Sequence, residues 1–236
     1  MAGVAAASPG FDHPIFSESI RLIRAALAEQ PLALGMDLDS LELPEQDVAL
    51  RLIHSSGDLS VAADLRFSPR SCSAGLQALA QGVSILTDTA MAAAAVAPMA
   101  RRTWANRVCS VLDWAPAQAP AGSTRAAAGM ARALAEHPGA VVLIGSAPTA
   151  LELLLDRVEE AESASASAST SSPALVIGMP VGFVGVAESK RRLAASGLPQ
   201  IRLEGSRGGA GLVAAAVNAL LRRSWLARAS AQAAAD

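Results

Sequence analysis

Apolar side chains follow a helical spacing in the first part of the chain. Ile20, Ile23 and Leu27 recur every three or four residues and predict an amphipathic helix. Further along, Pro44 suits the first turn of a second helix, and Ser68 is placed to cap a third. The helices predicted in this part span residues 17–29, 44–55 and 68–80.

From residue 83 onward the pattern changes to short apolar runs separated by helical stretches. Residues 140–144 and 174–177 are rich in Val, Ile and Leu without polar alternation, as expected of strands that helices cover on both faces. Such alternation is typical of a parallel α/β sheet. Strands are predicted at 83–86, 108–112, 140–144, 174–177 and 201–203, with helices at 88–97, 124–135, 149–158, 186–195 and 209–221.

These patterns predict an α/β fold, a three-layer sandwich with a mainly parallel central sheet of about five strands, preceded by an N-terminal helical segment. Residues 13–224 are expected to form a single domain. Residues 1–12 are expected to be a disordered lead, and residues 225–236 a fraying tail. A Ser-Ala tract within 159–172 is expected to form a mobile surface loop rather than a domain boundary.

Composition narrows the range of partners. The chain has 236 residues, of which 52% are hydrophobic, and a formal net charge of −2, so it can bury a core but lacks a general positive field for nucleic acid. No apolar run approaches the roughly 20 residues of a membrane span, so no membrane partner is expected. Cys72 and Cys109 lack metal-ligand spacing and are expected to be buried free thiols in a reducing, cytoplasmic compartment.

Small and flexible residues gather directly after the predicted strands. Ligands of open parallel sheets bind beyond the carboxyl ends of the strands, and glycine-rich turns there present free backbone N–H groups to anions. We therefore expect an anionic ligand, although each turn taken alone is also typical of a tight strand-to-helix connection. The turns span residues 145–149, 178–183 and 205–211, the last of which contains Arg207.

Most enzyme signatures are missing. No turn carries the Lys-Ser/Thr ending of a P-loop, no Gly-x-Gly-x-x-Gly follows the first strand, and no Gly-x-Ser-x-Gly is present. The histidines, at positions 13, 54 and 137, are too scattered to predict a metal site. His54 is the group best suited to proton transfer, because Arg51 projects from the same helix face. Spacing alone favours the alternative, a structural histidine at a helix end.

Several longer motifs resemble one family, the precorrin-8X methylmutases, also called precorrin isomerases. The resemblance runs from about residue 13 to residue 218. Its motifs are RLIH at 51–54, LRFSP at 65–69, LTD at 86–88 with Met91, IG and APTAL within 144–151, and above all GMPVGFV at 178–184 with ESK at 188–190. The sequence departs from the family at Ser146, where Asn is common, and at Ala210, where Ser is common.

The resemblance implies a homodimeric enzyme that moves a methyl group from C-11 to C-12 of precorrin-8X, giving hydrogenobyrinic acid without a cofactor. It implies that His54 is catalytic and that Ser19, Arg51 and Arg125 contact the substrate. We expect a protonated His54 to act on a ring nitrogen, and the arginines to bind the substrate's carboxylates. The alternatives are a non-catalytic tetrapyrrole carrier and an α/β protein that binds a nucleotide or phosphosugar.

Overall fold

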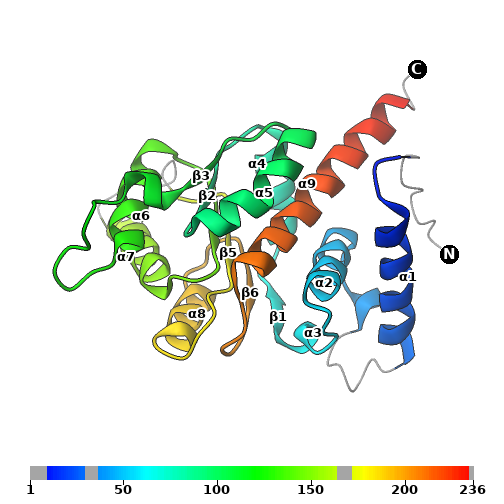
Figure 1. The fold of residues 1–236 in the computed structure, drawn as a ribbon, viewed down its shortest axis with the longest axis horizontal. Coiled ribbons are helices and arrows are strands. Elements are labelled where there is room, and N and C mark those ends of the chain that lie inside the picture. Colours follow the sequence, from blue (N-terminus) through cyan, green and yellow to red (C-terminus); the bar gives the residue numbers. More distant parts are fainter. Residues whose placement is uncertain (1–9, 30–36, 164–171, 234–236) are drawn as a thin grey trace.

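The computed structural model describes residues 10–29, 37–163 and 172–233 (Figure 1). Its central sheet confirms the expected α/β class, with six strands among the described residues instead of about five. The strands are β1 (Leu65–Phe67), β2 (Ile85–Thr87), β3 (Val108–Ser110), β4 (Val141–Ile144), β5 (Leu175–Gly178) and β6 (Gln200–Leu203).

The strand order is β1-β6-β5-β4-β2-β3. Neighbouring strands from β6 to β3 pair in parallel, which confirms the mainly parallel sheet. The additional strand, β1, pairs antiparallel with β6, so that Leu65 lies opposite Leu203. Three residues at a sheet edge carry no readable periodicity, and their strand conformation depends on pairing with a segment far along the chain.

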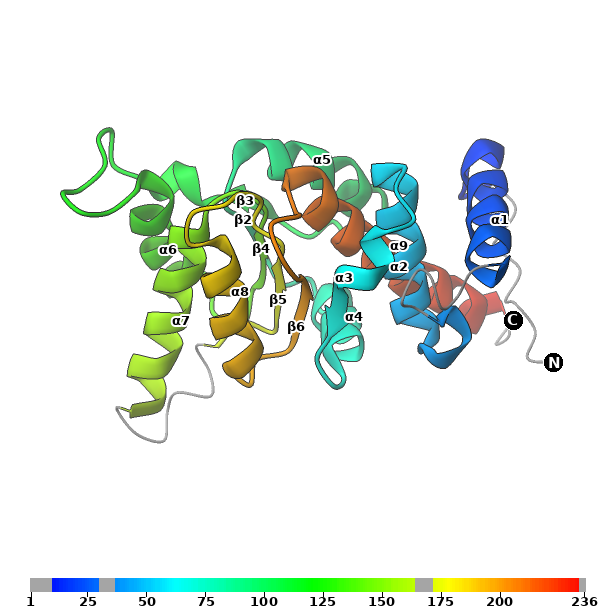
Figure 2. The ribbon, with the colours of Figure 1, turned by 90° about the horizontal axis from the view of Figure 1, so that it is seen from below.

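Helices cover both faces of the sheet (Figures 1 and 2). Val142 and Ile144 of β4 pack with α6 and α7, whereas Val141 and Leu143 point to the opposite face, where α4, α5 and α9 lie. This arrangement confirms the three-layer sandwich. The helices are α1 (Pro14–Glu29), α2 (Leu43–Ser56), α3 (Val61–Asp64), α4 (Ser71–Ala80), α5 (Ala90–Arg102), α6 (Arg125–Glu136), α7 (Pro148–Ser163), α8 (Val186–Ala195) and α9 (Ala210–Ala233), with 3-10 turns at Leu38–Ser40 and Val111–Trp114.

Several helix boundaries differ from those predicted: α1 begins at Pro14, three residues early, and α5 continues to Arg102, five residues past its predicted end. Ser68 does not cap α4; its Oγ accepts a hydrogen bond from Gln200 N at 2.8 Å, and α4 begins at Ser71. Helix α7 continues to Ser163, into the segment expected to be a loop, while the rest of the Ser-Ala tract, residues 164–171, lies outside the described residues. Helix α9 continues to Ala233.

The end of α9 is held by aromatic contacts, which explains why the expected tail is helical. Trp225 meets Trp104 of the α5–β3 connection nearly at right angles, with ring centroids 5.4 Å apart. The guanidinium of Arg228 lies 5.4 Å from the Trp225 ring and 5.1 Å from the Trp104 ring. Among the described helices, none is long and apolar enough to cross a membrane.

The expected disordered lead is ordered where it is described. Residues 1–9 lie outside the described residues, but Asp12 forms an ion pair with Arg222 of α9, and the Phe11 carbonyl accepts a hydrogen bond from Arg102. The division of the chain into lead, single domain and tail remains a prediction.

Candidate functional site

Helices α1 and α2 bring together three of the four predicted site residues. His54 lies in the last turn of α2, which Gly57 ends in the left-handed conformation at φ 67°. Arg51 lies one turn earlier on the same helix. Ser19 projects from α1, and its Oγ is 2.7 Å from His54 Nδ1. The three side chains are half-buried, so a ligand can reach them.

Phe16 of α1 lies at the centre of this group. Its ring is nearly perpendicular to that of His54, with centroids 5.1 Å apart. The Arg51 guanidinium carbon lies 4.6 Å from the Phe16 centroid, and that of Arg222 lies 5.7 Å from it. The sequence reasoning missed Phe16, although a position three residues before Ser19 places it on the same face of α1.

Arg222 and Asp12 complete the cluster. Arg222 Nε donates to Asp12 Oδ1 at 2.8 Å, and Nη2 donates to Oδ2, so the carboxylate is bound by both oxygens. Among the described residues no carboxylate forms an ion pair with Arg51, and no hydrogen bond from its guanidinium is found. The half-buried Arg51 therefore retains its hydrogen-bond donors for a ligand.

Charge and burial act together on the two candidate ligand-binding groups. Burial, and after it the nearby Arg222, lowers the pKa of Arg51, while Asp12 raises it in part. Burial and the positive charge of Arg51 lower the pKa of His54. Both causes favour the neutral imidazole in the free protein. In the tautomer whose Nδ1 accepts from Ser19 Oγ, the ring proton lies on Nε2; in either tautomer Nε2 is the nitrogen that Ser19 leaves for a ligand.

The glycine turn after β4 does not offer the free N–H groups that the sequence predicted. Asp88, fully buried after β2, accepts hydrogen bonds at Oδ2 from the backbone N–H groups of Gly145, Ser146 and Ala147, at 3.0, 2.6 and 2.8 Å. The anion at this turn is thus a side chain of the protein itself. Burial raises the pKa of Asp88, and the three hydrogen bonds oppose that rise.

The other two glycine turns pack against each other. A Cβ atom on Gly208 would lie 1.9 Å from the Met179 carbonyl oxygen, and Gly209 N donates to the same oxygen at 2.9 Å. Lys190, only 2% exposed, donates from Nζ to the carbonyls of Gly205 at 2.8 Å and Arg207 at 2.6 Å. Burial lowers the pKa of Lys190 to about 8. Lys190 thus fixes the carbonyls of the last turn, and the Met179 carbonyl joins the two turns, so their close packing is itself a structural role.

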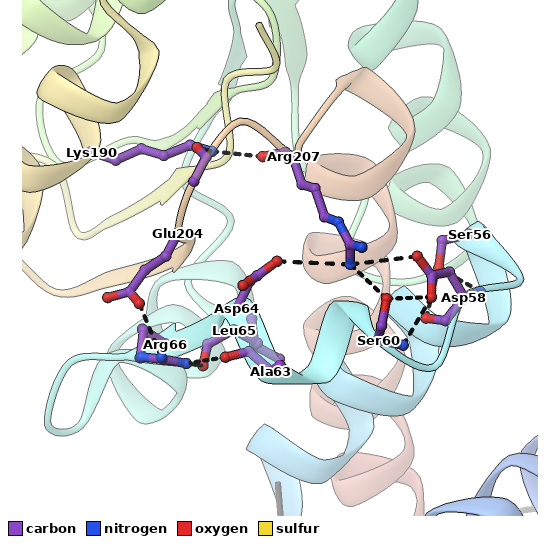
Figure 3. A network of polar contacts seen from close by, with 11 residues as sticks. Ser56, Asp58, Ser60, Ala63, Asp64, Leu65, Arg66, Lys190, Glu204 and Arg207 are labelled. Atoms are coloured by element: carbon purple, nitrogen blue, oxygen red, sulfur yellow. Dashed lines mark hydrogen bonds and ion pairs between the residues drawn. The ribbon is translucent and has the colours of Figure 1, made fainter. Parts of the chain in front are cut away.

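Arg207, expected to bind an anion, is likewise engaged within the protein (Figure 3). Its Nη1 donates to Ser60 Oγ at 2.8 Å and lies 3.4 Å from Asp58 Oδ2 and 3.7 Å from Asp64 Oδ2. These acceptors belong to the segment that follows the end of α2. Arg207 therefore connects the last glycine turn to the helix that carries His54.

Arg125 is the predicted site residue that the structure does not bring to His54. It is the first residue of α6, and its Nε donates to the Pro116 carbonyl at 2.9 Å. Figures 1 and 2 place α6 at one end of the molecule, and α1 and α2 at the other. In the connection between β5 and α8, Phe183 is 95% exposed and Val184 is 89% exposed.

The structure bears on two further expectations. Cys72 and Cys109 are buried and free, as predicted, and burial raises the pKa of Cys72 to about 12. The described part of the chain contains no group of three or more His, Cys, Asp or Glu side chains that could hold a metal ion.

Comparisons with known proteins place the chain and its fold in one family. The precorrin-8X methylmutase family model matches residues 14–223. A precorrin-8X methylmutase of Pseudomonas aeruginosa is 43% identical over 87% of this chain and 93% of its own, and a cobalt-precorrin-8 methylmutase of Synechocystis is 34% identical over 91% and 97%. The crystal structure of a precorrin-8X methylmutase from Thermus thermophilus matches with a TM-score of 0.74 and 36% identity, over 90% of this chain and 98% of that one. The chain belongs to the precorrin-8X methylmutase family.

Proposed function

We propose that the protein moves a methyl group from C-11 to C-12 of precorrin-8X, giving hydrogenobyrinic acid, with His54 acting as an acid on a ring nitrogen. The family consists of methylmutases, which are isomerases of cobalamin biosynthesis. The observation that carries the proposal is the placement of His54 beside Arg51 at the end of α2. A shift within one molecule requires the protein to hold the ring and to stabilise a changed electron distribution, so we propose no redox cofactor.

Arg51 links substrate binding to the protonation of His54. In the free protein the charge of Arg51 helps to keep the imidazole neutral. A substrate carboxylate bound to Arg51 neutralises that charge and so raises the pKa of His54. The imidazolium is then favoured only when substrate is in place. Nε2 is the nitrogen that faces the substrate, because Ser19 occupies Nδ1.

Ser19 and Arg125 have different places in this proposal. Ser19, expected to contact substrate, already orients His54 through its hydrogen bond, so we assign it both roles. Arg125 begins α6, and within one protomer α6 lies at the opposite end of the molecule from α1. We propose a homodimer in which Arg125 of one protomer approaches His54 of its partner. Phe183 and Val184, exposed in the connection from β5 to α8, offer apolar contact area for such an interface.

The proposed reaction is tested by mixing the purified protein with precorrin-8X and following the visible spectrum. We expect conversion to hydrogenobyrinic acid, and a loss of turnover of roughly 100-fold or more in His54→Ala, since general acid catalysis contributes about 10²–10⁴-fold. Product affinity should change little. A wild-type protein that binds hydrogenobyrinic acid without converting precorrin-8X is a carrier, and wild-type turnover by His54→Ala contradicts the assigned acid. Running the assay with cobalt-containing substrate shows which form is used.

The shared site is tested by mixing two inactive variants. His54→Ala and Arg125→Ala protomers, each of low activity alone, should recover activity when refolded or expressed together, because half of the sites in a mixed dimer contain both residues. Absence of recovery in a mixed dimer shown to form by differential tagging contradicts a site shared between protomers.

We also propose that the protein acts in the cytoplasm on a small tetrapyrrole, without nucleic acid or membrane partners. The support is chemical. Two buried free thiols fit a reducing compartment, and Arg51, which forms no ion pair within the described residues, fits a carboxylate-bearing ligand.

A further inference from the structure

Phe16 lies next to three basic side chains of the α1–α2 cluster, the group formed by Asp12, Phe16, Ser19, Arg51, His54 and Arg222. The Arg51 guanidinium lies 4.6 Å from its ring centroid, and the His54 ring centroid lies 5.1 Å away at an interplanar angle of 88°. Arg222 approaches the same ring at 5.7 Å. The positions of Arg51 and His54 are thus both defined against one rigid aromatic ring.

The two arginines around this ring are stabilised in different ways. Arg222 is paired with Asp12, which binds its guanidinium with both oxygens. Arg51 has no such partner among the described residues, although it is half-buried and close enough to Arg222 for their charges to repel. The negative face of the Phe16 ring is the group in contact that compensates the Arg51 charge.

A cation–π contact differs from an ion pair because it leaves the N–H donors of the guanidinium free. A guanidinium that rests its face on an aromatic ring keeps its N–H donors, which lie in its plane, for other acceptors. Arg222 has given donors to Asp12, whereas Arg51 has not given its donors to a carboxylate of the described chain. The contact with the Phe16 ring therefore positions Arg51 while its N–H donors stay available to a carboxylate.

We propose that Phe16 is a positioning residue of the methylmutase site, which holds the Arg51 guanidinium over its ring by a cation–π contact, so that the N–H donors of Arg51 remain free for a substrate carboxylate. This inference rests on the proposed function, because it assigns the same substrate to Arg51. Phe16 acts through Arg51, and its contact with His54 keeps the carboxylate-binding group and the acid at a fixed separation.

The test compares Phe16→Leu with Phe16→Tyr, first in the wild-type protein and then in the Arg51→Met variant. Phe16→Leu retains an apolar side chain but removes the ring face, so we expect KM for precorrin-8X to rise about five- to tenfold, with a smaller change in kcat. Phe16→Tyr retains the face and should stay within about twofold of wild type. In an Arg51→Met background, Phe16→Leu should change KM by less than about twofold, because the group that it positions is gone. Ile15→Leu, an exposed change on the same helix, is the matched control.

A role limited to packing α1 would give a different result. In that case Phe16→Leu raises KM by the same factor with and without Arg51, and this additivity overturns the proposal. Phe16→Met is measured in parallel, so that a folding failure of the Leu variant does not decide the outcome. A wild-type protein that neither converts precorrin-8X nor binds hydrogenobyrinic acid contradicts the proposed function and the role of Phe16 together. Additive effects in an active enzyme contradict the role of Phe16 alone.

Discussion

The α1–α2 cluster and the glycine-rich edge of the sheet differ in how far the protein satisfies its own polar groups. At the sheet edge, Asp88 binds three backbone N–H groups, Lys190 binds two carbonyls, and Arg207 lies among two carboxylates and a hydroxyl. In the α1–α2 cluster, Arg51 has no carboxylate partner in the described chain, and His54 keeps one ring nitrogen uncommitted by Ser19. A glycine-rich turn alone thus does not indicate a ligand site, because Asp88 takes the N–H groups of the turn after β4.

This contrast separates residues that support the fold from residues that are available for chemistry. Substitutions at the sheet edge should change stability first, and substitutions in the α1–α2 cluster should change binding first. Substitutions of Asp88, Arg51 and Lys190 test that separation, and their expected effects decrease in this order.

Removing the internal anion at the sheet edge should destabilise the protein strongly. In Asp88→Ala, the N–H groups of Gly145, Ser146 and Ala147 lose their shared acceptor, and we expect the free energy of unfolding to fall by about 3 kcal/mol. Urea denaturation measures this change. Asp88→Asn keeps an acceptor oxygen and should lose less. Unchanged stability in Asp88→Ala, together with weakened binding of hydrogenobyrinic acid, would make this edge a ligand site and reverse the comparison.

Removing the charge of Arg51 should weaken ligand binding more than it lowers the stability of the fold. Arg51→Met loses a charge-assisted contact, so we expect affinity for hydrogenobyrinic acid to fall roughly 30-fold, about 2 kcal/mol, in calorimetric titration. The pKa of His54 in the free protein should rise, because Arg51 lowers it; an NMR titration of the imidazole protons follows the change. Arg21→Met, an exposed change on α1 that removes only a pair with Glu18, is the control. Unchanged affinity would place substrate carboxylates elsewhere.

The buried ammonium of Lys190 gives the smallest predicted effect, and it depends on pH. The pKa of Lys190 is about 8 in the folded protein, below its ordinary value of 10.5, so the unfolded chain holds this proton more tightly. Between pH 8 and pH 10 the wild type should therefore gain roughly 1 to 2 kcal/mol of unfolding free energy relative to Lys190→Met. Urea denaturation at both pH values measures the difference. A wild type that instead loses stability over this range would show that the hydrogen bonds of the charged amine outweigh the effect of its burial.

The sheet core could be read from the sequence because its signal is local. β4 and β5 are continuous runs of Val, Leu and Ile buried on both faces, and the sequence placed both within about one residue of their observed bounds. β1 could not be read, since it becomes a strand only through pairing with β6. The continuation of α9 was missed for a similar reason, because the contact between Trp225 and Trp104 joins distant segments.

In the candidate site, too, local spacing predicted some of the residues, whereas others depend on contacts between distant segments. Arg51 and His54 are three residues apart on one helix, so local spacing predicted their shared face. The contacts of Phe16 and the pairing of Asp12 with Arg222 depend on how α1 and α9 pack, which no local pattern encodes. The N–H groups of the turn after β4 looked free because Asp88, which occupies them, lies 57 to 59 residues earlier in the chain.

The pairing of Asp12 with Arg222 has a consequence for synthesis on the ribosome. Asp12 leaves the exit tunnel before any strand of the sheet, whereas Arg222 emerges only after the whole sheet has been made. N-terminal segments generally fold first during translation, yet here the surroundings of Phe16 are complete only once α9 has emerged and docked. A nascent chain that still lacks α9 can form α1 and α2, but it cannot present Arg51 and His54 in their final setting.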